Sequence, residues 1–175
     1  MVAAIIAVSV AAFHLLTIRP GHYWGDDFAM YILHARNIAH GLPYGETGYI
    51  YNPSNPFLSP RTYPPVYPLM LAPIIRCCGA NIEAMKVFSL LFFPAALLVI
   101  FLLFRKEIRA GYALALIAIL GASPFFWDFK DVARPDLPFL LFVYLAFLGE
   151  RISAAAASPP RRAAGRRSPP LPGPD

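Results

Sequence analysis

The chain of 175 residues is 58% apolar and only 14% charged, and its mean hydropathy is +0.54. Charged residues make up about a quarter of an average soluble domain, so this composition excludes an ordinary soluble domain. The formal charge of +5 comes mostly from short basic clusters at the ends of apolar runs. That distribution favours orientation in a membrane and argues against binding to nucleic acid.

The first apolar run covers residues 2–18 and contains no acidic or basic residue. A helix of that length just crosses about 30 Å of hydrocarbon. The run has neither the basic start nor the small-residue cleavage site of a signal peptide, so it predicts a retained transmembrane helix. His14 lies within it and is expected to be a packed, neutral side chain, because one histidine without partners does not make a metal site.

Residues 87–104 form the clearest predicted span. They carry no charge, and 14 of the 18 are Val, Ile, Leu or Phe. On the insertion scale these side chains contribute on the order of −6 kcal/mol, which is enough to absorb a kink at Pro94. Arg105, Lys106 and Arg109 follow at once and give the strongest orientation signal in the chain.

Two further spans are predicted at residues 111–126 and 136–152. The apolar run in the second is only 13 residues long, 137–149, so it is expected to recruit flanking residues at both ends. Residues 153–175 are rich in Ala, Pro and Arg. With nothing to bury, this tail is expected to be disordered.

The runs together predict an all-α membrane protein with about four transmembrane helices over residues 1–152. The positive-inside rule places both chain ends in the cytoplasm. It makes residues 19–81 a long extracytoplasmic first loop. The predicted location is therefore the plasma (inner) membrane, as a multi-pass protein.

The first half of that loop predicts a helix lying on the membrane. Over residues 26–40, apolar side chains recur at helical spacing, and Gly41 and Pro43 then form a stop signal. The opposite face carries polar residues, which are His34, Arg36, Asn37 and His40.

The second half of the loop is rich in proline and tyrosine. Its tyrosines, including Tyr63 and Tyr67, form either an interfacial belt or a sugar-lined cleft, and the residues alone leave both interpretations open. Residues 66–75 are apolar but short, and Pro68 and Pro73 are expected to break them. They predict a re-entrant or surface helix with interfacial character.

Asp26 and Asp27 stand where the chain leaves the first predicted span, between aromatic residues suited to the headgroup level. Charge is costly at that boundary unless it is solvated or used, so paired acids there are candidates for a functional site. The pattern alone favours a simpler role, because acids at a helix N-terminus interact favourably with the helix dipole.

Other charged residues near the predicted spans have simple structural roles open to them. Lys86 is placed to snorkel to the interface. Arg134 can pair with Asp136, an acid that is expensive at the start of a span. No His, Cys and Glu ligand set accompanies the acids, so no metal or other cofactor is predicted. The adjacent Cys77 and Cys78 are expected to be apolar packing residues.

Four features follow one another along the chain in a particular order and spacing. They are Gly25-Asp26-Asp27 with Tyr31, then Ala35, Asn37, Gly41 and Tyr44; the segment Tyr63-Pro64-Pro65-Val66-Tyr67-Pro68-Leu69; Gly79-Ala80-Asn81 leading to Lys86; and Asp136-Leu137-Pro138 before the last span. In these features the chain resembles the N-terminal part of the integral-membrane glycosyltransferases of the C superfamily. That group includes the protein O-mannosyltransferases and the lipid A aminoarabinose transferases. The resemblance covers residues 1–152, well under half of such an enzyme.

The resemblance implies transfer of a sugar, with inversion, from a polyprenyl-phosphate donor to an extracytoplasmic acceptor. It implies Asp26 as the base, because a carboxylate must take the proton of the acceptor hydroxyl. It implies Asp27 as the partner of that base or as the residue that positions the acceptor. The implied substrate-binding residues are Tyr31, Tyr63, Tyr67, Lys86, Arg134 and Asp136. Of these, Lys86 and Arg134 would contact the phosphate.

The chain departs from the family in two ways. The aminoarabinose enzymes carry a lysine near the position of Tyr63, and none is present here, so that lipid-phosphate contact is not carried over. The later spans are also missing, and the chain is expected to be a fragment, a truncated product, or one whose tail leaves the family reading frame near Ser153. The alternative function is a catalytically inactive membrane fragment or assembly subunit. A transporter half fits less well, because the acids lie in loops rather than mid-span.

Overall fold

In the part of the chain that the computed structural model describes, every regular element is an α-helix. The structure describes all residues except 23, 25–26, 49–53, 55–61 and 158–175, and of Asp27 only the backbone. Within these ranges there are seven helices and no strand. They are α1 (Val2–Leu16), α2 (Asp27–His40), α3 (Val66–Cys78), α4 (Ile82–Phe104), α5 (Ala110–Gly121), α6 (Pro124–Phe129) and α7 (Asp136–Ala157).

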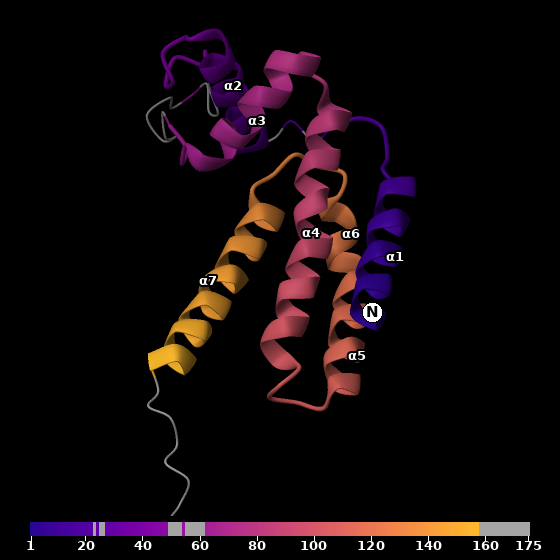
Figure 1. Ribbon diagram of the computed structural model, residues 1–175. Helices are drawn as coiled ribbons and strands as arrows, with labels where there is room; N and C mark the ends of the chain where they lie inside the picture. The colour runs from indigo at the N-terminus through magenta and orange to yellow at the C-terminus, as the bar shows by residue number, and fades with distance from the viewer. Residues whose placement is uncertain (23, 25–26, 49–53, 55–61, 158–175) are drawn as a thin grey trace, which may run out of the picture.

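Helix α4 lies at the centre of the molecule. It packs against α7, α1 and α5, and in Figure 1 these helices follow the long axis in alternating directions. We call this group, with α6, the bundle. Helices α2 and α3 pack against each other and form a lobe at its upper end (Figure 1), which we call the α2–α3 lobe.

Each part has its own apolar core. In the bundle, Phe93 and Leu97 of α4 cluster with Ile117 of α5 and Leu137 of α7. The lobe core joins α2, α3 and the start of α4, through Ile32, Ala35, Leu71, Ile75 and Met85. Since Met85 belongs to α4, the lobe is packed onto the same helix that centres the bundle.

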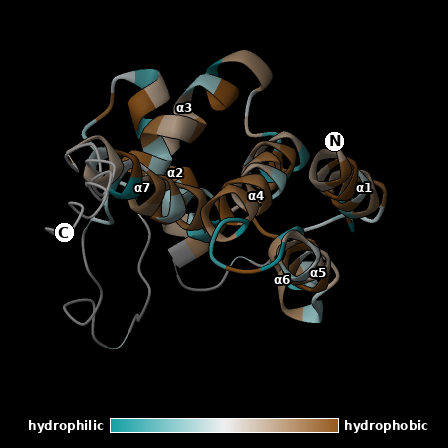
Figure 2. Ribbon diagram, turned by 60° about the horizontal axis from the view of Figure 1, so that its bottom comes forward, coloured by the Kyte–Doolittle hydropathy of each residue, from teal (hydrophilic) through white to brown (hydrophobic). Residues whose placement is uncertain are grey.

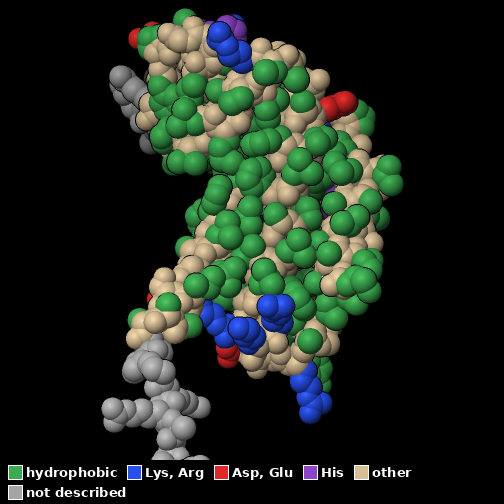
Figure 3. Space-filling model, in the orientation of Figure 1, with side chains coloured by type: hydrophobic (Ala, Val, Ile, Leu, Met, Phe, Trp, Pro, Cys, Tyr) green, Lys and Arg blue, Asp and Glu red, His purple; other side chains and the backbone are tan. Residues whose placement is uncertain are grey.

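Among the described residues, two helices are long and apolar enough to cross a membrane, α4 with 23 residues and α7 with 22. The bundle helices are coloured mostly as hydrophobic in Figure 2, and hydrophobic side chains cover much of the face of the bundle that Figure 3 shows. On α7 the exposed apolar side chains are Phe139, Phe142, Leu145, Phe147 and Ile152. A continuous exposed apolar face of this kind marks contact with lipid or with another protein. Helices α1 and α5 are shorter, with 15 and 12 residues.

The third predicted span, residues 111–126, is divided into two helices, α5 and α6. Pro124 has no N–H and disfavours helical backbone at the residue before it, and Ser123 accordingly has an extended ψ of 130°. The break frees the carbonyl of Gly121, which lies 3.0 Å from Nε2 of His14 in α1. His14 is buried, as predicted, and a neighbouring helix thus satisfies a backbone group freed by proline.

The prediction that Pro68 and Pro73 break the apolar run of residues 66–75 is wrong, because α3 continues through both of them. Pro68 lies in the first turn, where helix N–H groups have no intrahelical partner to lose. Pro73 lies further inside and removes one hydrogen bond. Burial of Leu71 and Ile75 in the lobe core holds the helix together across that defect.

Helix α4 begins before the predicted span of residues 87–104. Its N-cap is Asn81, whose side-chain oxygen accepts a hydrogen bond from the Ala84 N–H at 3.0 Å. Asparagine is among the strongest N-caps, and Glu83 adds an acid to the first turn. These are local helix signals that hydropathy alone does not register.

Helix α7 continues beyond the predicted span of residues 136–152, to Ala157. The prediction of disorder from residue 153 is therefore wrong for residues 153–157. Alanine has the highest helix propensity, so the alanine run extends the helix without needing burial. The remainder of the predicted tail, residues 158–175, lies outside the described residues.

Helix α2 confirms the helix predicted at residues 26–40 and its stop signal. Gly41 has a positive φ of 67°, a conformation that glycine adopts without strain. The Leu42 N–H then donates to the Asn37 carbonyl at 2.8 Å, which closes the helix end in the pattern of a Schellman motif.

The predicted polar outer face of α2 is only partly correct. Arg36 and His40 are exposed, but His34 and Asn37 are buried. The loop after α2 folds back over them, and the Asn37 amide donates to the carbonyls of Pro43 and Glu46 at 2.9 and 3.1 Å.

Cys77 and Cys78 are both exposed at the end of α3. The prediction that they are buried packing residues is therefore wrong. The α3 residues that pack in the lobe core end at Ile75, and the cysteines lie beyond it.

Candidate functional site

The acidic pair lies at the edge of what the structure describes. Asp26 is outside the described residues, and Asp27 is the first residue of α2 with only its backbone described. Their proposed roles therefore stay predictions. The structure does fix the helix that follows them, and this helix leads to the tyrosines of the candidate site.

Three of the predicted substrate-binding tyrosines come together. Tyr31 lies one turn after the start of α2, and its ring centroid is 5.2 Å from that of Tyr63 and 5.5 Å from that of Tyr67. The contact with Tyr67 is edge-to-face, with an interplanar angle of 82°, a favourable arrangement for aromatic pairs. The pairing joins α2 to α3 and to the segment before it.

A cavity of about 540 Å³ opens beside this tyrosine cluster. It lies between the α2–α3 lobe and the first turns of α7, where Figure 3 shows the molecule hollowed at its left side. Its lining is mostly apolar and consists of Tyr31, Pro64, Val66, Tyr67, Met70, Pro135, Asp136, Pro138, Phe139 and Phe142. The volume is within the range of small-molecule sites.

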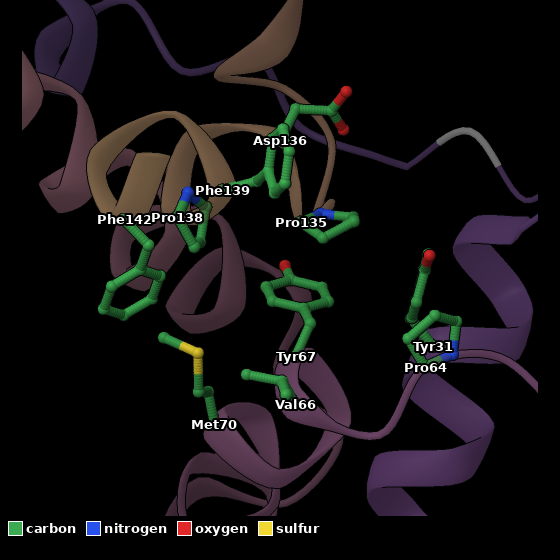
Figure 4. A pocket seen from close by; sticks show the side chains of 10 residues that line it. All are labelled: Tyr31, Pro64, Val66, Tyr67, Met70, Pro135, Asp136, Pro138, Phe139 and Phe142. Carbon is green, nitrogen blue, oxygen red and sulfur yellow. The ribbon is translucent and has the colours of Figure 1, made fainter. Parts of the chain in front are cut away.

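The polar atoms of the cavity lie toward one side. In Figure 4 the hydroxyl groups of Tyr31 and Tyr67 point toward the top of the view, where the carboxylate of Asp136 lies, while Met70 and Phe142 lie at its left and lower left. Phe139 and Phe142 also belong to the exposed face of α7. The cavity therefore combines an apolar side, continuous with the outside of the bundle, with a more polar side.

The hydroxyl of Tyr67 is fixed by α4. It lies 2.6 Å from Oγ of Ser89, and Ser89 in turn donates to the Met85 carbonyl at 2.9 Å. Because the serine proton is used there, Tyr67 is the donor in its bond to Ser89. Burial raises the pKa of the Tyr67 hydroxyl well above its usual range, against the opposing effect of that bond, so the group stays protonated.

Asp136 is the acid of the cavity, and it is paired. Nε of Arg134 lies 2.5 Å from one carboxylate oxygen and the terminal nitrogen lies 3.1 Å from the other. The same guanidinium stands 4.0 Å from the ring centroid of Phe129. The predicted structural alternative, that Arg134 pairs with Asp136, is thus confirmed.

Lys86 does not reach the cavity. Its side chain is buried, and its ammonium group donates to the Arg19 carbonyl at 2.9 Å and to the Gly21 carbonyl. It therefore ties the segment after α1 to α4. Arg134 is the second cation expected at a phosphate. It does not line the cavity itself, but it is paired with Asp136, which does.

A cluster that the sequence did not single out lies on the other side of α4. Asp131 accepts hydrogen bonds from Lys130 at 2.6 Å and from the Arg19 backbone and side chain, both at 2.7 Å. Partial burial alone would raise the pKa of the Asp131 carboxyl, but these bonds outweigh it and lower the pKa. The cluster locks the connection after α1 to the segment before α7.

The residues that sequence reasoning missed are the apolar walls of the cavity. Met70 and Val66 are four positions apart on α3, and Phe139 and Phe142 three apart on α7, so each pair shares a helix face. The shared face of each pair could be predicted from this spacing, but the spacing does not indicate that the face of α3 and the face of α7 line one cavity.

The described residues include no group of three or more His, Cys, Asp or Glu side chains close enough to hold a metal ion. What the cavity offers is a wall for an apolar chain, two tyrosine hydroxyl groups, of which that of Tyr67 already donates to Ser89, and one carboxylate held in an ion pair. This combination suits a ligand with a greasy part and a polar part.

Comparisons with protein-family models, with curated proteins and with solved structures gave no match.

Proposed function

We propose that the chain is the N-terminal part of a membrane glycosyltransferase that uses a polyprenyl-phosphate sugar. One observation supports this most: Tyr31, Tyr67 and Asp136, chosen from the sequence as substrate-binding residues, line the same cavity. They come from three helices, so the sequence does not oblige them to meet. A lipid-linked sugar has the mixed character that this cavity accommodates.

In this proposal the apolar side of the cavity takes the first isoprene units of the donor, and the tyrosine side takes its sugar. Asp26 is the base that removes the proton of the acceptor hydroxyl, and Asp27 positions the acceptor. Helix α2 begins at Asp27 and brings Tyr31 to the cavity within one turn. The acidic pair is therefore close to the cavity along the chain. The acceptor is a lipid, glycan or protein.

The membrane arrangement proposed with it has four spans, formed by α1, α4, α5 with α6, and α7. Their alternating directions (Figure 1) and the length of α4 and α7 support it. Arg105, Lys106 and Arg109 follow α4 at the end away from the lobe. By the positive-inside rule that end is cytoplasmic, as are both chain ends, and the lobe is extracytoplasmic at the plasma (inner) membrane.

The direct test is a transfer assay on the complete gene product in proteoliposomes, with a radiolabelled polyprenyl-phosphate sugar and extracted acceptors. We expect Asp26→Asn to lower transfer by a factor of about 10² to 10⁴, the usual effect of removing a general base. Glu46→Gln, which neutralises an exposed acid in the same loop, should leave transfer unchanged. Transfer by the Asp26→Asn variant at the wild-type rate would reject the assignment.

The cavity is tested separately. Met70→Trp fills it, and should raise the KM for the lipid donor while the protein still inserts in the membrane. Leu69→Trp places the same side chain on an exposed position of α3 and should leave KM unchanged. Equal KM values for the two variants would remove the cavity from the proposal.

The alternative is a catalytically inactive membrane component. Its support is that both cations expected at a phosphate already have partners, Lys86 with two backbone carbonyls and Arg134 with Asp136. This alternative predicts no transfer by wild-type protein with any acceptor, and normal assembly of the Asp26→Asn variant.

A further inference from the structure

The end of the bundle away from the lobe holds a second cavity, of about 310 Å³. It lies where α4 ends and α7 approaches its own end. Its walls include Leu102, Arg105, Lys106, Leu148, Arg151 and Ile152. Figure 3 shows the basic side chains gathered at this lower end, directly below the hydrophobic surface of the bundle.

Arg151 shapes this cavity by tying α7 to α4. It donates to the carbonyl of Leu103, in the last turn of α4, and forms an ion pair with Glu107. The carboxylate of Glu107 therefore neutralises Arg151. The cavity is held by contacts between residues 44 and 48 positions apart in the chain.

Arg105 and Lys106 are in a different situation. Both are exposed, and within the described part of the chain neither has an ion-pair partner. With Arg151 balanced by Glu107, they leave two uncompensated positive charges at the mouth of the cavity. The floor beneath them is apolar, from Leu102 on α4 and Leu148 on α7.

We propose that this cavity binds the headgroup of an anionic phospholipid, with an acyl chain lying in the groove between α4 and α7. Basic pockets between membrane helices are suited to anionic headgroups, because guanidinium and ammonium groups donate charge-assisted hydrogen bonds to phosphate. A soluble phosphate would use the cations but not the apolar floor. The inference rests on the membrane placement in the proposed function, and it is independent of sugar transfer.

The test is a lipid titration of the full chain in detergent, followed by native mass spectrometry. Phosphatidylglycerol is compared with phosphatidylcholine carrying the same acyl chains. We expect phosphatidylglycerol to bind at least about ten-fold more tightly, since each basic residue near an anionic surface contributes about five-fold.

Two single-charge variants and a matched control separate this site from the net charge of the protein. Arg105→Gln and Lys106→Gln should each weaken phosphatidylglycerol binding about five-fold. Arg36→Gln removes the same charge from an exposed position on the lobe and should change nothing. Among the described residues that line or contact the cavity, Glu107 is the only acid. Glu107→Gln removes its negative charge and keeps the hydrogen bond from Arg151 to the Leu103 carbonyl. This variant should bind phosphatidylglycerol more tightly.

Three results would overturn the inference: equal binding of the two lipids, an Arg36→Gln loss as large as that of Lys106→Gln, or displacement of the lipid by free glycerol phosphate at equal concentration. Measuring sugar transfer on the same protein distinguishes failure of the lipid site from failure of the proposed function. Lipid selectivity without transfer rejects only the enzyme, and transfer without selectivity rejects only this site.

Discussion

At the residue scale, the buried side chains of Lys86 and His34 each form hydrogen bonds that hold a connecting segment against a helix. Lys86 in α4 binds the carbonyls of Arg19 and Gly21. A buried ammonium group is costly unless its protons are used, and here the backbone uses them. This explains why a lysine is tolerated near the start of a long apolar helix.

We expect Lys86→Met to lower the free energy of unfolding by about 1.5–3 kcal/mol, the usual contribution of hydrogen bonds to a charged group. Methionine replaces the apolar body of the lysine side chain with an unbranched one that is one atom shorter, and it removes the ammonium donors. The measurement is denaturation by sodium dodecyl sulfate in detergent, followed by circular dichroism.

The control for this prediction is Lys106→Met, the same substitution at an exposed lysine, in detergent without phospholipid. It should leave the unfolding midpoint unchanged. Equal unfolding midpoints for Lys86→Met and Lys106→Met would show that the hydrogen bonds of Lys86 do not stabilise the fold. Lys86 would then again be a candidate for binding phosphate.

The hydrogen bonds of His34 define its tautomer. Nε2 accepts from the Tyr63 N–H at 3.3 Å, so the proton is on Nδ1, which donates to the Tyr44 carbonyl at 2.7 Å. Protonation of the ring would turn its only acceptor into a donor. Burial lowers the pKa of His34 from its ordinary value, against the opposing effect of the Tyr44 bond.

This shift gives a pH dependence with a defined sign. Since the pKa of His34 is lower in the folded protein, the unfolded chain binds the proton first as the pH falls. The contribution of neutral His34 to the free energy of unfolding is fully present above the ordinary histidine pKa of about 6.5 and decreases as the pH falls below it. We expect the Tm to fall between about pH 7.5 and about pH 5.5.

The residue responsible is identified by comparing two variants. His34→Gln should reduce this dependence, whereas His40→Gln, which changes an exposed histidine on the same helix, should retain it. An unchanged slope in the His34→Gln variant would show that another group titrates.

At the element scale, α1 and α5 approach each other closely at Gly121. A Cβ placed on Gly121 would lie 2.4 Å from a methyl carbon of Val10 and 3.4 Å from Leu97. Valine is stiff because its side chain branches at Cβ, so it has little room to move aside. The Gly121 carbonyl also lies within hydrogen-bond distance of His14. Both this hydrogen bond and the packing of Val10 on Gly121 therefore depend on the close approach of α1 to α5.

We expect Gly121→Ala to lower the free energy of unfolding by about 1–3 kcal/mol, the usual cost of overpacking, by pushing α1 away from α5. The measurement is again denaturation in detergent. Because the clash is with Val10, the double variant Val10→Ala with Gly121→Ala should recover part of the loss.

Gly111 provides a matched control in the same helix, because a Cβ there meets no atom within 4 Å. Gly111→Ala should leave stability unchanged or raise it by up to about 1 kcal/mol, since alanine favours helices. Equal effects at the two positions would mean that α1 does not pack against α5 as described.

At the scale of the whole molecule, the two ends differ in character. The α2–α3 lobe carries the tyrosine cavity and the exposed cysteines, Cys77 and Cys78. The opposite end carries Arg105 and Lys106. In the proposed topology these ends face opposite sides of the membrane.

The topology predicts that a membrane-impermeant maleimide labels the natural cysteines in intact cells. The Cys77→Ser and Cys78→Ser double variant should not be labelled. In that background Lys106→Cys should be labelled only after permeabilisation. Labelling of the natural cysteines only after permeabilisation would invert the topology, and labelling of both ends in intact cells would reject four spans.

Local pattern accounts for most of the helices of this chain. The α2 stop at Gly41, the apolar stretch of α4 and the burial of His14 were all predictable, because glycine conformation, hydropathy and helical spacing act over a few residues. The errors occurred where neighbours override local preference. Pro73 stays within a helix because Leu71 and Ile75 are buried on both sides of it, and His34 is buried because a later loop covers it.

The sequence alone determined the helical class, the apolar composition and the candidate residues. Only the tertiary structure decided that Tyr31, Tyr67 and Asp136 share one cavity while Lys86 is turned away from it. The physical reason is that a cavity, and the partner of a buried charge, depend on how helices far apart in the chain pack together. Hydropathy and spacing report only which residues prefer to be buried, and not which residues they meet.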